Sequence, residues 1–317
     1  MLQVRQNVPR LPVLELPERK RPLPFVRNLE AVSERIGRIR APHAPLPSRR
    51  RQQALVVGAI VSAALILLFL FTIDGLSPGW PRDVTKAVRH TFQAITQLGR
   101  SNWLLVPSGV LCIALLLADW DRTSRRIAAA WTELGALSGF FFVSIAAAGM
   151  TTNFVKWTLG RSRPILFDTD GPYRLTPISF DYSHVSFPSG HTTTAAAAAM
   201  ALVLIFPGRP WVKVAAVVFA VSIGVSRVMV RAHYPSDVVG GMFVGIAVTI
   251  LCAHAFGRRG IAFQSQSDGT LLPKTVALRG VFAAPGGARR ALDALGGAWA
   301  AAFRREDAAA VDKRRDG

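Results

Sequence analysis

Three positively charged side chains each lie beside a long apolar run. Lys156 and Arg163 follow one apolar stretch, seven residues apart, and Arg227 ends another. If the first segment is helical, seven residues make two turns, so Lys156 and Arg163 face the same point. Charges beside membrane segments are costly and mark functional sites. Because arginine binds oxygens in pairs, three converging cations predict a phosphate-binding site.

A serine and a glycine precede a segment with strong helical character. The sequence Pro188-Ser189-Gly190-His191 stands directly before a run rich in alanine. Ser189 suits the N-cap position, where the first N–H groups of a helix have no partner within the helix. Gly190 lets an anion approach the backbone closely. We therefore expect Ser189 and Gly190 to contribute to the phosphate site.

Two histidines and one aspartate supply the reactive groups. His233 and Asp237 are four residues apart, and Pro235 between them suits the first turn of a helix. Asp237 can then fix the tautomer of His233 and leave the other ring nitrogen free to attack phosphorus. His191 lies across the predicted site and can protonate the leaving oxygen. The three side chains together favour phosphoryl transfer.

The same side chains have simpler explanations. A single cation at a helix end often reaches toward lipid headgroups, and a single histidine at a helix start is more often structural than catalytic. A metal site formed by His191, His233 and Asp237 is the competing chemical use. We expect no metal and no cofactor, because the three nearby cations would repel a divalent ion.

Six apolar stretches predict an all-α, polytopic membrane protein with a bundle of six transmembrane helices. The stretches cover residues 54–73, 103–117, 127–150, 191–206, 211–226 and 238–256. Residues 54–256 therefore form the predicted membrane domain. Residues 1–53 and 257–317 form two basic tails.

The positive charge predicts the orientation of this bundle. The chain carries a net charge of +19, and 28 of its 38 Lys and Arg residues fall on one side when the amino terminus is placed inside. The positive-inside rule then puts both tails in the cytoplasm and the candidate site on the outer face. A charge of this size also occurs in nucleic-acid-binding proteins, but the long uncharged runs argue against a nucleic-acid partner. Cys112 and Cys252 lie within apolar runs and predict neither disulfide nor zinc site.

Segments outside the six stretches have the spacing of amphipathic helices. One lies in the amino-terminal tail and would either rest on the anionic inner leaflet or fray. A second covers residues 84–98, at the membrane interface, and a third lies in the carboxyl-terminal tail. The apolar residues of the two tail helices are Phe25, Leu29, Val32, Ile36 and Ile39, and Leu292, Leu295, Trp299 and Phe303. Glu133, within the third apolar stretch, either sits at the interface or pairs inside the bundle, and we favour the interface.

The motifs together resemble the three-part signature of the type 2 phosphatidic acid phosphatase superfamily. The matching parts are Lys156-x6-Arg163-Pro164, Pro188-Ser189-Gly190-His191 and Ser226-Arg227-x5-His233-x3-Asp237. The resemblance covers roughly residues 54–256 and neither tail. It implies a metal-independent phosphatase that forms a phosphohistidine, with His233 as nucleophile, Asp237 as its partner and His191 as general acid. Lys156, Arg163, Ser189, Gly190 and Arg227 would hold the phosphate.

The resemblance implies a substrate class but not one substrate. We expect a lipid phosphatase of a bacterial inner membrane whose substrate is undecaprenyl diphosphate, phosphatidic acid, phosphatidylglycerol phosphate or a lipid A phosphate. The alternatives are a lipid phosphotransferase with the same site and a non-catalytic lipid-binding or transport module. Soluble relatives of this superfamily hold vanadate as haloperoxidases, but the apolar stretches argue against that branch. The sequence does not determine the oligomeric state.

Overall fold

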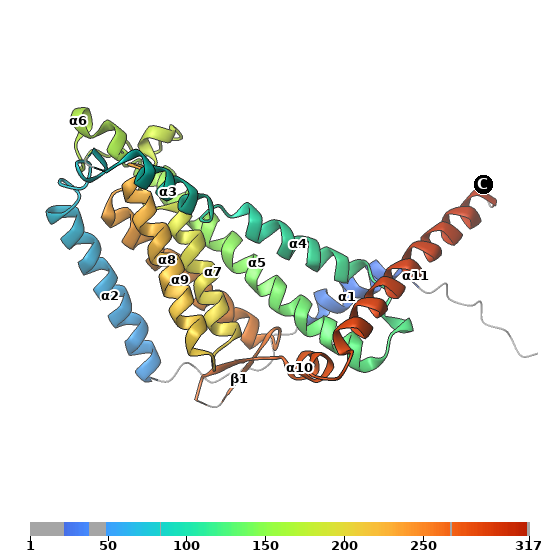
Figure 1. The fold of residues 1–317 in the computed structure, drawn as a ribbon. Helices are drawn as coiled ribbons and strands as arrows, with labels where there is room; N and C mark the ends of the chain where they lie inside the picture. The colour runs from blue at the N-terminus through green and yellow to red at the C-terminus, as the bar shows by residue number, and fades with distance from the viewer. Residues whose placement is uncertain (1–21, 38–48, 83, 267, 316–317) are drawn as a thin grey trace, which may run out of the picture.

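The computed structural model describes residues 22–37, 49–82, 84–266 and 268–315, and helices dominate it (Figure 1). The helices are α1 Pro24–Gly37, α2 Arg49–Thr72, α3 Lys86–Gln97, α4 Asn102–Leu117, α5 Arg125–Leu159, α6 Phe167–Asp170, α7 Gly190–Ile205, α8 Pro210–Met229, α9 Pro235–Arg258, α10 Val276–Phe282 and α11 Gly287–Arg315. Two short antiparallel strands, β1 Phe263–Ser265 and β2 Leu271–Pro273, form a hairpin. The rest of the amino-terminal tail, including Ile39, lies outside the described residues.

Each of the six predicted apolar stretches lies on a helix, namely α2, α4, α5, α7, α8 and α9. Five helical stretches within the described residues are long and apolar enough to cross a membrane. One of the five joins α3 and α4 as Lys86–Leu117. By themselves, α4 and α7 have 16 residues each. The all-α membrane fold is therefore confirmed, whereas the number of six crossings stays a prediction. Cys112 and Cys252 are both free thiols.

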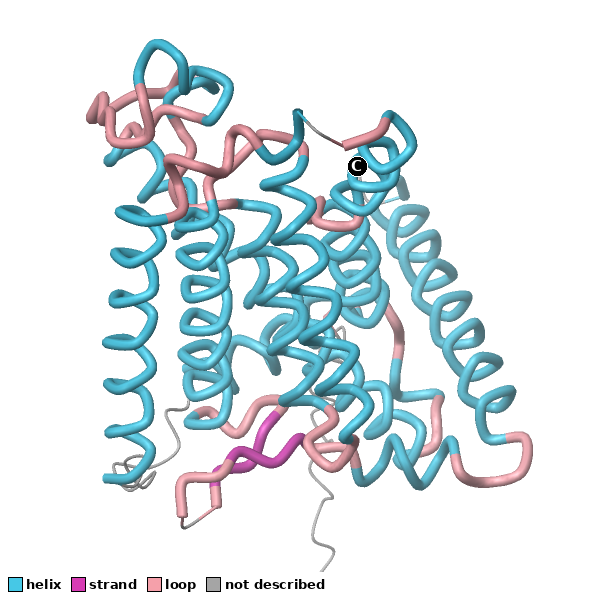
Figure 2. The backbone as a smooth tube through the Cα atoms, turned by 60° about the vertical axis from the view of Figure 1, so that its left-hand side comes forward, coloured by secondary structure: helices cyan, strands magenta, loops and turns pink. Residues whose placement is uncertain are grey.

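Helix α7 forms the centre of the bundle. It packs against α5, α8 and α9, and Figure 1 shows it among them. Figure 2 shows that helices make up most of the fold. The side chains of Ala195 through Ala199 are buried. Glycines on α9 permit the close approach, because a Cβ at Gly241 would lie 2.6 Å from the Ser189 carbonyl oxygen, and one at Gly245 would lie 2.5 Å from that of Thr193. Close α7–α9 packing fixes the distance between two parts of the candidate site.

Helix α5 continues beyond the predicted end at residue 150. It has 35 residues, or about 50 Å at a rise of 1.5 Å per residue, which exceeds the hydrocarbon core. It stops at Gly160, whose φ of 63° is left-handed. A Cβ at Gly160 would come within 1.6 Å of the Thr176 carbonyl oxygen, so only glycine fits this turn. The turn directs the following residues back over the bundle.

Helices α1 and α10 and the start of α11 lie at the end of the bundle opposite to α3 and α6 (Figure 1). In α1, Asn28 donates to the carbonyl oxygens of Leu116 and Ala118 at the end of α4. The predicted amphipathic helix is present there, with Phe25, Leu29 and Val32 exposed. Its apolar face therefore has no cover from the described part of the chain.

The carboxyl-terminal segment packs on the same end of the bundle. Phe263 is fully buried against Phe140, with their ring centroids 4.7 Å apart. In α11, Trp299 donates to the Ala114 carbonyl oxygen, whereas Leu292 and Phe303 stay exposed. The domain boundary at residue 256 stays a prediction, although the chain beyond it contributes to the core of the bundle.

Glu133 pairs with this carboxyl-terminal segment. Its carboxylate accepts hydrogen bonds from the backbone N–H groups of Ala277 and Leu278, in the first turn of α10, at 3.2 and 2.8 Å. The interfacial position of Glu133 stays a prediction, because these hydrogen bonds do not place the residue relative to a membrane. The carboxylate satisfies N–H groups that a helix start leaves without acceptors.

Candidate active site

The eight predicted site residues all lie at one end of the bundle, although they come from four helices and two connecting segments. Lys156 is in the last turn of α5, Arg227 in the last turn of α8, and Asp237 in the first turn of α9. Ser189 precedes α7, whose first residues are Gly190 and His191. Arg163 follows α5, and His233 lies between α8 and α9. This common location agrees with the topology predicted from the sequence.

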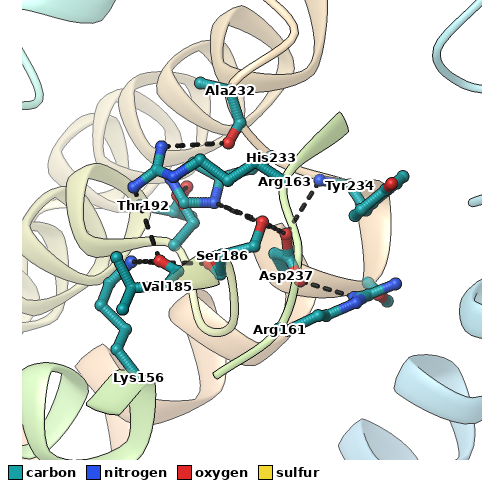
Figure 3. A network of polar contacts seen from close by, with 12 residues as sticks. Lys156, Arg161, Arg163, Val185, Ser186, Thr192, Ala232, His233, Tyr234 and Asp237 are labelled. Carbon is teal, nitrogen blue, oxygen red and sulfur yellow. Dashed lines mark hydrogen bonds and ion pairs between the residues drawn. The ribbon is translucent and has the colours of Figure 1, made fainter. Parts of the chain in front are cut away.

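The helical relationship expected between Lys156 and Arg163 is wrong. Helix α5 ends at Leu159, and Arg163 lies in extended backbone beyond the Gly160 turn. The two side chains nevertheless meet, because the Lys156 ammonium and the Arg163 guanidinium both donate to the Val185 carbonyl oxygen, at 2.9 and 3.5 Å (Figure 3). The reversal of the chain therefore brings the two cations together.

His233 and Asp237 form the expected pair. The Asp237 Oδ2 atom lies 3.5 Å from His233 Nδ1 and accepts hydrogen bonds from the Ser186 hydroxyl at 2.6 Å and the Tyr234 N–H at 2.9 Å. The last bond also caps the start of α9. His233 is 2% exposed and Asp237 fully buried. This arrangement holds Nδ1 toward the carboxylate, so the opposite ring nitrogen, Nε2, is the one left to react.

The three predicted phosphate-binding cations are buried and donate to neutral oxygens. Lys156, Arg163 and Arg227 are 8%, 5% and 8% exposed. Arg163 donates to the carbonyl oxygens of Tyr182 and Ala232 at 2.7 and 3.2 Å, and its guanidinium lies 3.8 Å from the centre of the Tyr182 ring. Among the residues that the structure describes, none of the three cations forms an ion pair with a carboxylate. Buried positive charge without an anion is unfavourable, so an anionic ligand would stabilise this arrangement.

The start of α7 lies against these groups. Ser189 is fully buried and donates its N–H to the Asp237 carbonyl oxygen at 2.9 Å. Its hydroxyl accepts from the Thr192 hydroxyl at 2.9 Å, so Ser189 holds the N-cap position without the expected side-chain cap. A Cβ at Gly190 would lie 3.8 Å from Lys156 Cε, which places the glycine beside that cation. His191 follows as the second residue of α7 and is half-buried.

Four residues that the sequence reasoning did not assign complete this end of the bundle. Arg161 is 4% exposed and forms ion pairs with Asp74 at 2.8 Å and Asp237 at 2.6 Å. Ser186 contacts Asp237, as described above, and Thr96 on α3 accepts from Arg227 Nη1 at 2.7 Å. The sequence could have indicated Asp74 as a candidate site residue, because it is the first charged residue after the apolar stretch 54–73. Ser186 and Thr96 have no such signal in the sequence.

Burial shifts the acid–base properties of the residues in the connecting segments. Complete burial lowers the pKa of His233 well below its ordinary value, and the opposing effect of Asp237 does not restore it. His233 is therefore neutral at neutral pH, as attack on phosphorus requires. Burial also lowers the pKa of Arg163. For Arg161, burial lowers the pKa, but the charges of Asp237 and Asp74 outweigh it and raise the pKa overall.

Comparison with known proteins adds independent evidence. A family model described as the PAP2 superfamily matches residues 137–261. A lipid A 1-phosphatase of Rhizobium etli is 32% identical over 236 residues, which cover 72% of this chain and 95% of that protein. An undecaprenyl-diphosphatase of Sulfolobus acidocaldarius is 31% identical over 109 residues, which cover 34% of this chain and 50% of that protein.

Among solved structures, a PAP2-type phosphatidylglycerolphosphate phosphatase from Bacillus subtilis matches with a TM-score of 0.43 and 21% identity. This match covers 61% of the present chain and 92% of that one. The family model and the long match to the Rhizobium protein show that this chain belongs to the PAP2 superfamily and is a phosphatase.

Proposed function

We propose that this protein is a metal-independent lipid phosphatase that acts through a phosphohistidine at His233, with the 1-phosphate of lipid A as its leading substrate. One observation carries the reaction class. Three buried cations, Lys156, Arg163 and Arg227, lie at the same end of the bundle as a neutral, oriented histidine, and neutral oxygens are the acceptors of their hydrogen bonds. A phosphate group supplies the negative charge that these cations lack.

In the proposed first step, His233 Nε2 attacks phosphorus and the bond from phosphorus to the lipid oxygen breaks. Asp237 stabilises the positive charge that develops on the ring through Nδ1. His191 gives a proton to the departing lipid oxygen. The three cations and the free N–H groups at the start of α7 stabilise the charge on the other phosphate oxygens.

In the second step, water attacks the phosphohistidine and releases inorganic phosphate. His191, now neutral, accepts a proton from this water, so the site returns to its starting state. No metal is needed in this scheme, because the fixed cations supply the charge stabilisation that a divalent ion supplies in other phosphatases.

Two observations support a lipid as the substrate. The helices that carry the site are long and apolar, and exposed aromatic side chains surround it, as at membrane–water interfaces. These aromatic residues include Trp157, Phe180 and Tyr182. The match to the lipid A 1-phosphatase extends over most of this chain, so lipid A 1-phosphate is preferred. The shorter match to an undecaprenyl-diphosphatase makes undecaprenyl diphosphate the second candidate.

We further propose that the site faces the periplasm or exterior from a bacterial inner membrane, with both tails in the cytoplasm. The charge distribution of the sequence supports this orientation. So does the position of α1 and of the start of α11 at the end of the bundle opposite to α3 (Figure 1). Labelling of single cysteines introduced at exposed Leu292 or Phe180 in intact cells tests it, since only the second is expected to react with an impermeant reagent.

The decisive experiment measures phosphate release by purified protein in detergent with a chelator present. Its substrates are lipid A 1-phosphate, undecaprenyl diphosphate, phosphatidic acid and phosphatidylglycerol phosphate. The intact protein, the His233→Asn variant and a His90→Asn control, whose histidine is exposed on α3, are compared. We expect turnover by the intact protein and the control only.

Four results would contradict the proposal. Turnover by His233→Asn at the rate of the control would exclude the phosphohistidine, and activity only with added metal would exclude the metal-independent reaction. Transfer of phosphate to an added lipid or sugar acceptor in preference to water would instead identify a phosphotransferase. Binding without turnover by the intact protein would identify a lipid-binding module.

A further inference from the structure

Arg161 occupies a buried position between two carboxylates. Its Nη1 atom lies 2.6 Å from Asp237 Oδ1, and its Nη2 atom lies 2.8 Å from Asp74 Oδ2. Both carboxylates are fully buried, and the arginine side chain is 5% exposed. Figure 3 shows Asp237 between Arg161 on one side and Ser186 with His233 on the other. Arg161 therefore contacts the carboxylate that contacts the proposed nucleophile.

The remaining hydrogen-bonding capacity of Arg161 is also used by the protein. Nη1 donates to the Ser236 hydroxyl at 2.7 Å, and Nη2 and Nε donate to the Pro172 carbonyl oxygen at 2.8 and 3.1 Å. The guanidinium lies 4.5 Å from the centre of the Tyr234 ring. All five N–H groups of the arginine thus have acceptors in the chain. Arg161 differs in this respect from Arg227, whose buried Nε has no hydrogen-bond partner among the described residues.

This pairing determines how the Asp237 carboxylate is turned. Oδ1 is held by Arg161, whereas Oδ2 accepts from the Ser186 hydroxyl and the Tyr234 N–H and faces His233 Nδ1. Rotation of the carboxylate would break the short contact to Arg161. The planar fork of arginine therefore fixes the oxygen that orients the histidine.

Asp74 holds Arg161 from the other side. It follows α2, and its carboxylate also accepts from the N–H of Ser236, at 3.1 Å, and from the Ser236 hydroxyl. Helix α2 lies at the edge of the bundle in Figure 1, and many of its apolar side chains are exposed. Asp74 therefore connects the end of this peripheral helix to the first turn of α9.

We propose that Arg161 and Asp74 are positioning residues for the phosphatase reaction: Asp74 holds Arg161, Arg161 holds Asp237, and Asp237 orients His233. The inference rests on the proposed role of His233. Because the chain itself occupies every donor of Arg161, this arginine does not bind the substrate phosphate. Its loss therefore lowers kcat and leaves KM nearly unchanged, in contrast to loss of Arg163.

The test compares Arg161→Lys, which keeps the charge but lacks the fork, with Asp74→Asn, which keeps the size but lacks the charge. Arg174→Lys is the matched control, because that side chain is 60% exposed in the same loop. Steady-state kinetics use the lipid phosphate that the intact protein hydrolyses best. We expect kcat to fall by about 10²-fold in Arg161→Lys, the cost of a small misplacement of a reacting group, and by less in Asp74→Asn. Thermal unfolding in detergent identifies any variant that does not fold.

The outcomes separate this inference from the proposed function. If Arg161→Lys raises KM without lowering kcat, Arg161 binds substrate and the positioning role is rejected. If both variants match the control while His233→Asn is inactive, the positioning role is rejected and the proposed function stands. If His233→Asn is itself active, the proposed function fails. Should Arg161→Lys not fold, the kcat of folded Asp74→Asn decides, since a value equal to that of the control rejects the inference.

Discussion

The guanidinium of Arg227 donates to the hydroxyl of Thr96 across 2.7 Å, and this contact joins the end of α8 to α3. The two residues are 131 positions apart in the sequence. Thr96 is buried on an otherwise largely exposed helix. Among the buried atoms that the structure describes, two arginine Nε atoms have no hydrogen-bond partner, those of Arg227 and Arg231. Thr96 therefore holds in place a cation that has unused capacity for a ligand.

The first prediction concerns this contact. Thr96→Val keeps the shape of the side chain and removes the acceptor, so Arg227 loses a bond worth about 1.5–3 kcal/mol. We expect kcat/KM for lipid phosphate to fall by about tenfold or more, and inhibition by inorganic phosphate to weaken. Thr91→Val is the control, because Thr91 is exposed on the same helix and donates only to the Ala87 carbonyl oxygen. Equal kinetics in the two variants would show that Thr96 does not position Arg227.

The second prediction concerns His191 as general acid. His191→Gln should slow hydrolysis of lipid phosphates by about 10²–10⁴-fold, the usual contribution of a general acid. It should slow hydrolysis of p-nitrophenyl phosphate much less, because p-nitrophenolate leaves without a proton. The ratio of the two kcat/KM values is the measurement. An equal loss for both substrates would show that His191 acts in some other way, such as binding phosphate.

The third prediction concerns the protonation of His233. Burial holds the pKa of this imidazole well below 6.5, so the ring stays neutral in mildly acidic solution. In protein labelled with ¹³C-histidine, the signal that disappears in His233→Asn should keep its neutral chemical shift down to pH 6. A transition at or above pH 6.5 would contradict the buried environment.

The same pKa shift determines the expected pH profile. Because His233 is already deprotonated, lowering the pH toward 6 does not remove the nucleophile. The fall of kcat/KM at acidic pH should therefore follow the second ionisation of the substrate phosphate, at about pH 6. Substrates whose phosphates have different pKa values should shift this fall, and a fall that stays at the same pH for all of them would assign it to the enzyme.

The fourth prediction concerns the docking of the carboxyl-terminal segment. Glu133→Ala removes the acceptor for the N–H groups of Ala277 and Leu278, at a cost of about 1 kcal/mol, as for other lost helix caps. We expect faster hydrogen exchange in α10 and unchanged phosphatase activity. Asp293→Ala, at an exposed position on α11, is the control. Unchanged exchange in Glu133→Ala would show that other contacts hold α10.

The long uncharged stretches explain why the helical fold could be predicted from the sequence. Long uncharged stretches require helices, because only helices satisfy their own backbone inside a membrane, and all six stretches lie on helices. The end of α5 was less predictable. Its helical pattern continues past residue 150 into charged residues, and the stop at Gly160 depends on contact with Thr176 from a later segment.

By itself, the sequence determined which reactive side chains are present and so predicted the chemistry of the candidate site, because residue identities and short spacings are local properties. These residues are Lys156, Arg163, Arg227, His191, His233 and Asp237. The tertiary structure alone decided what surrounds them. Asp74 meets Arg161 across 87 residues, and Ser186 meets Asp237 across 51. No local pattern reports such pairs, since they arise only when separate helices pack and their ends come to lie together. Packing therefore distinguishes two kinds of cation. Two carboxylates hold Arg161, whereas Lys156, Arg163 and Arg227 have no carboxylate partner in the part of the chain that the structure describes.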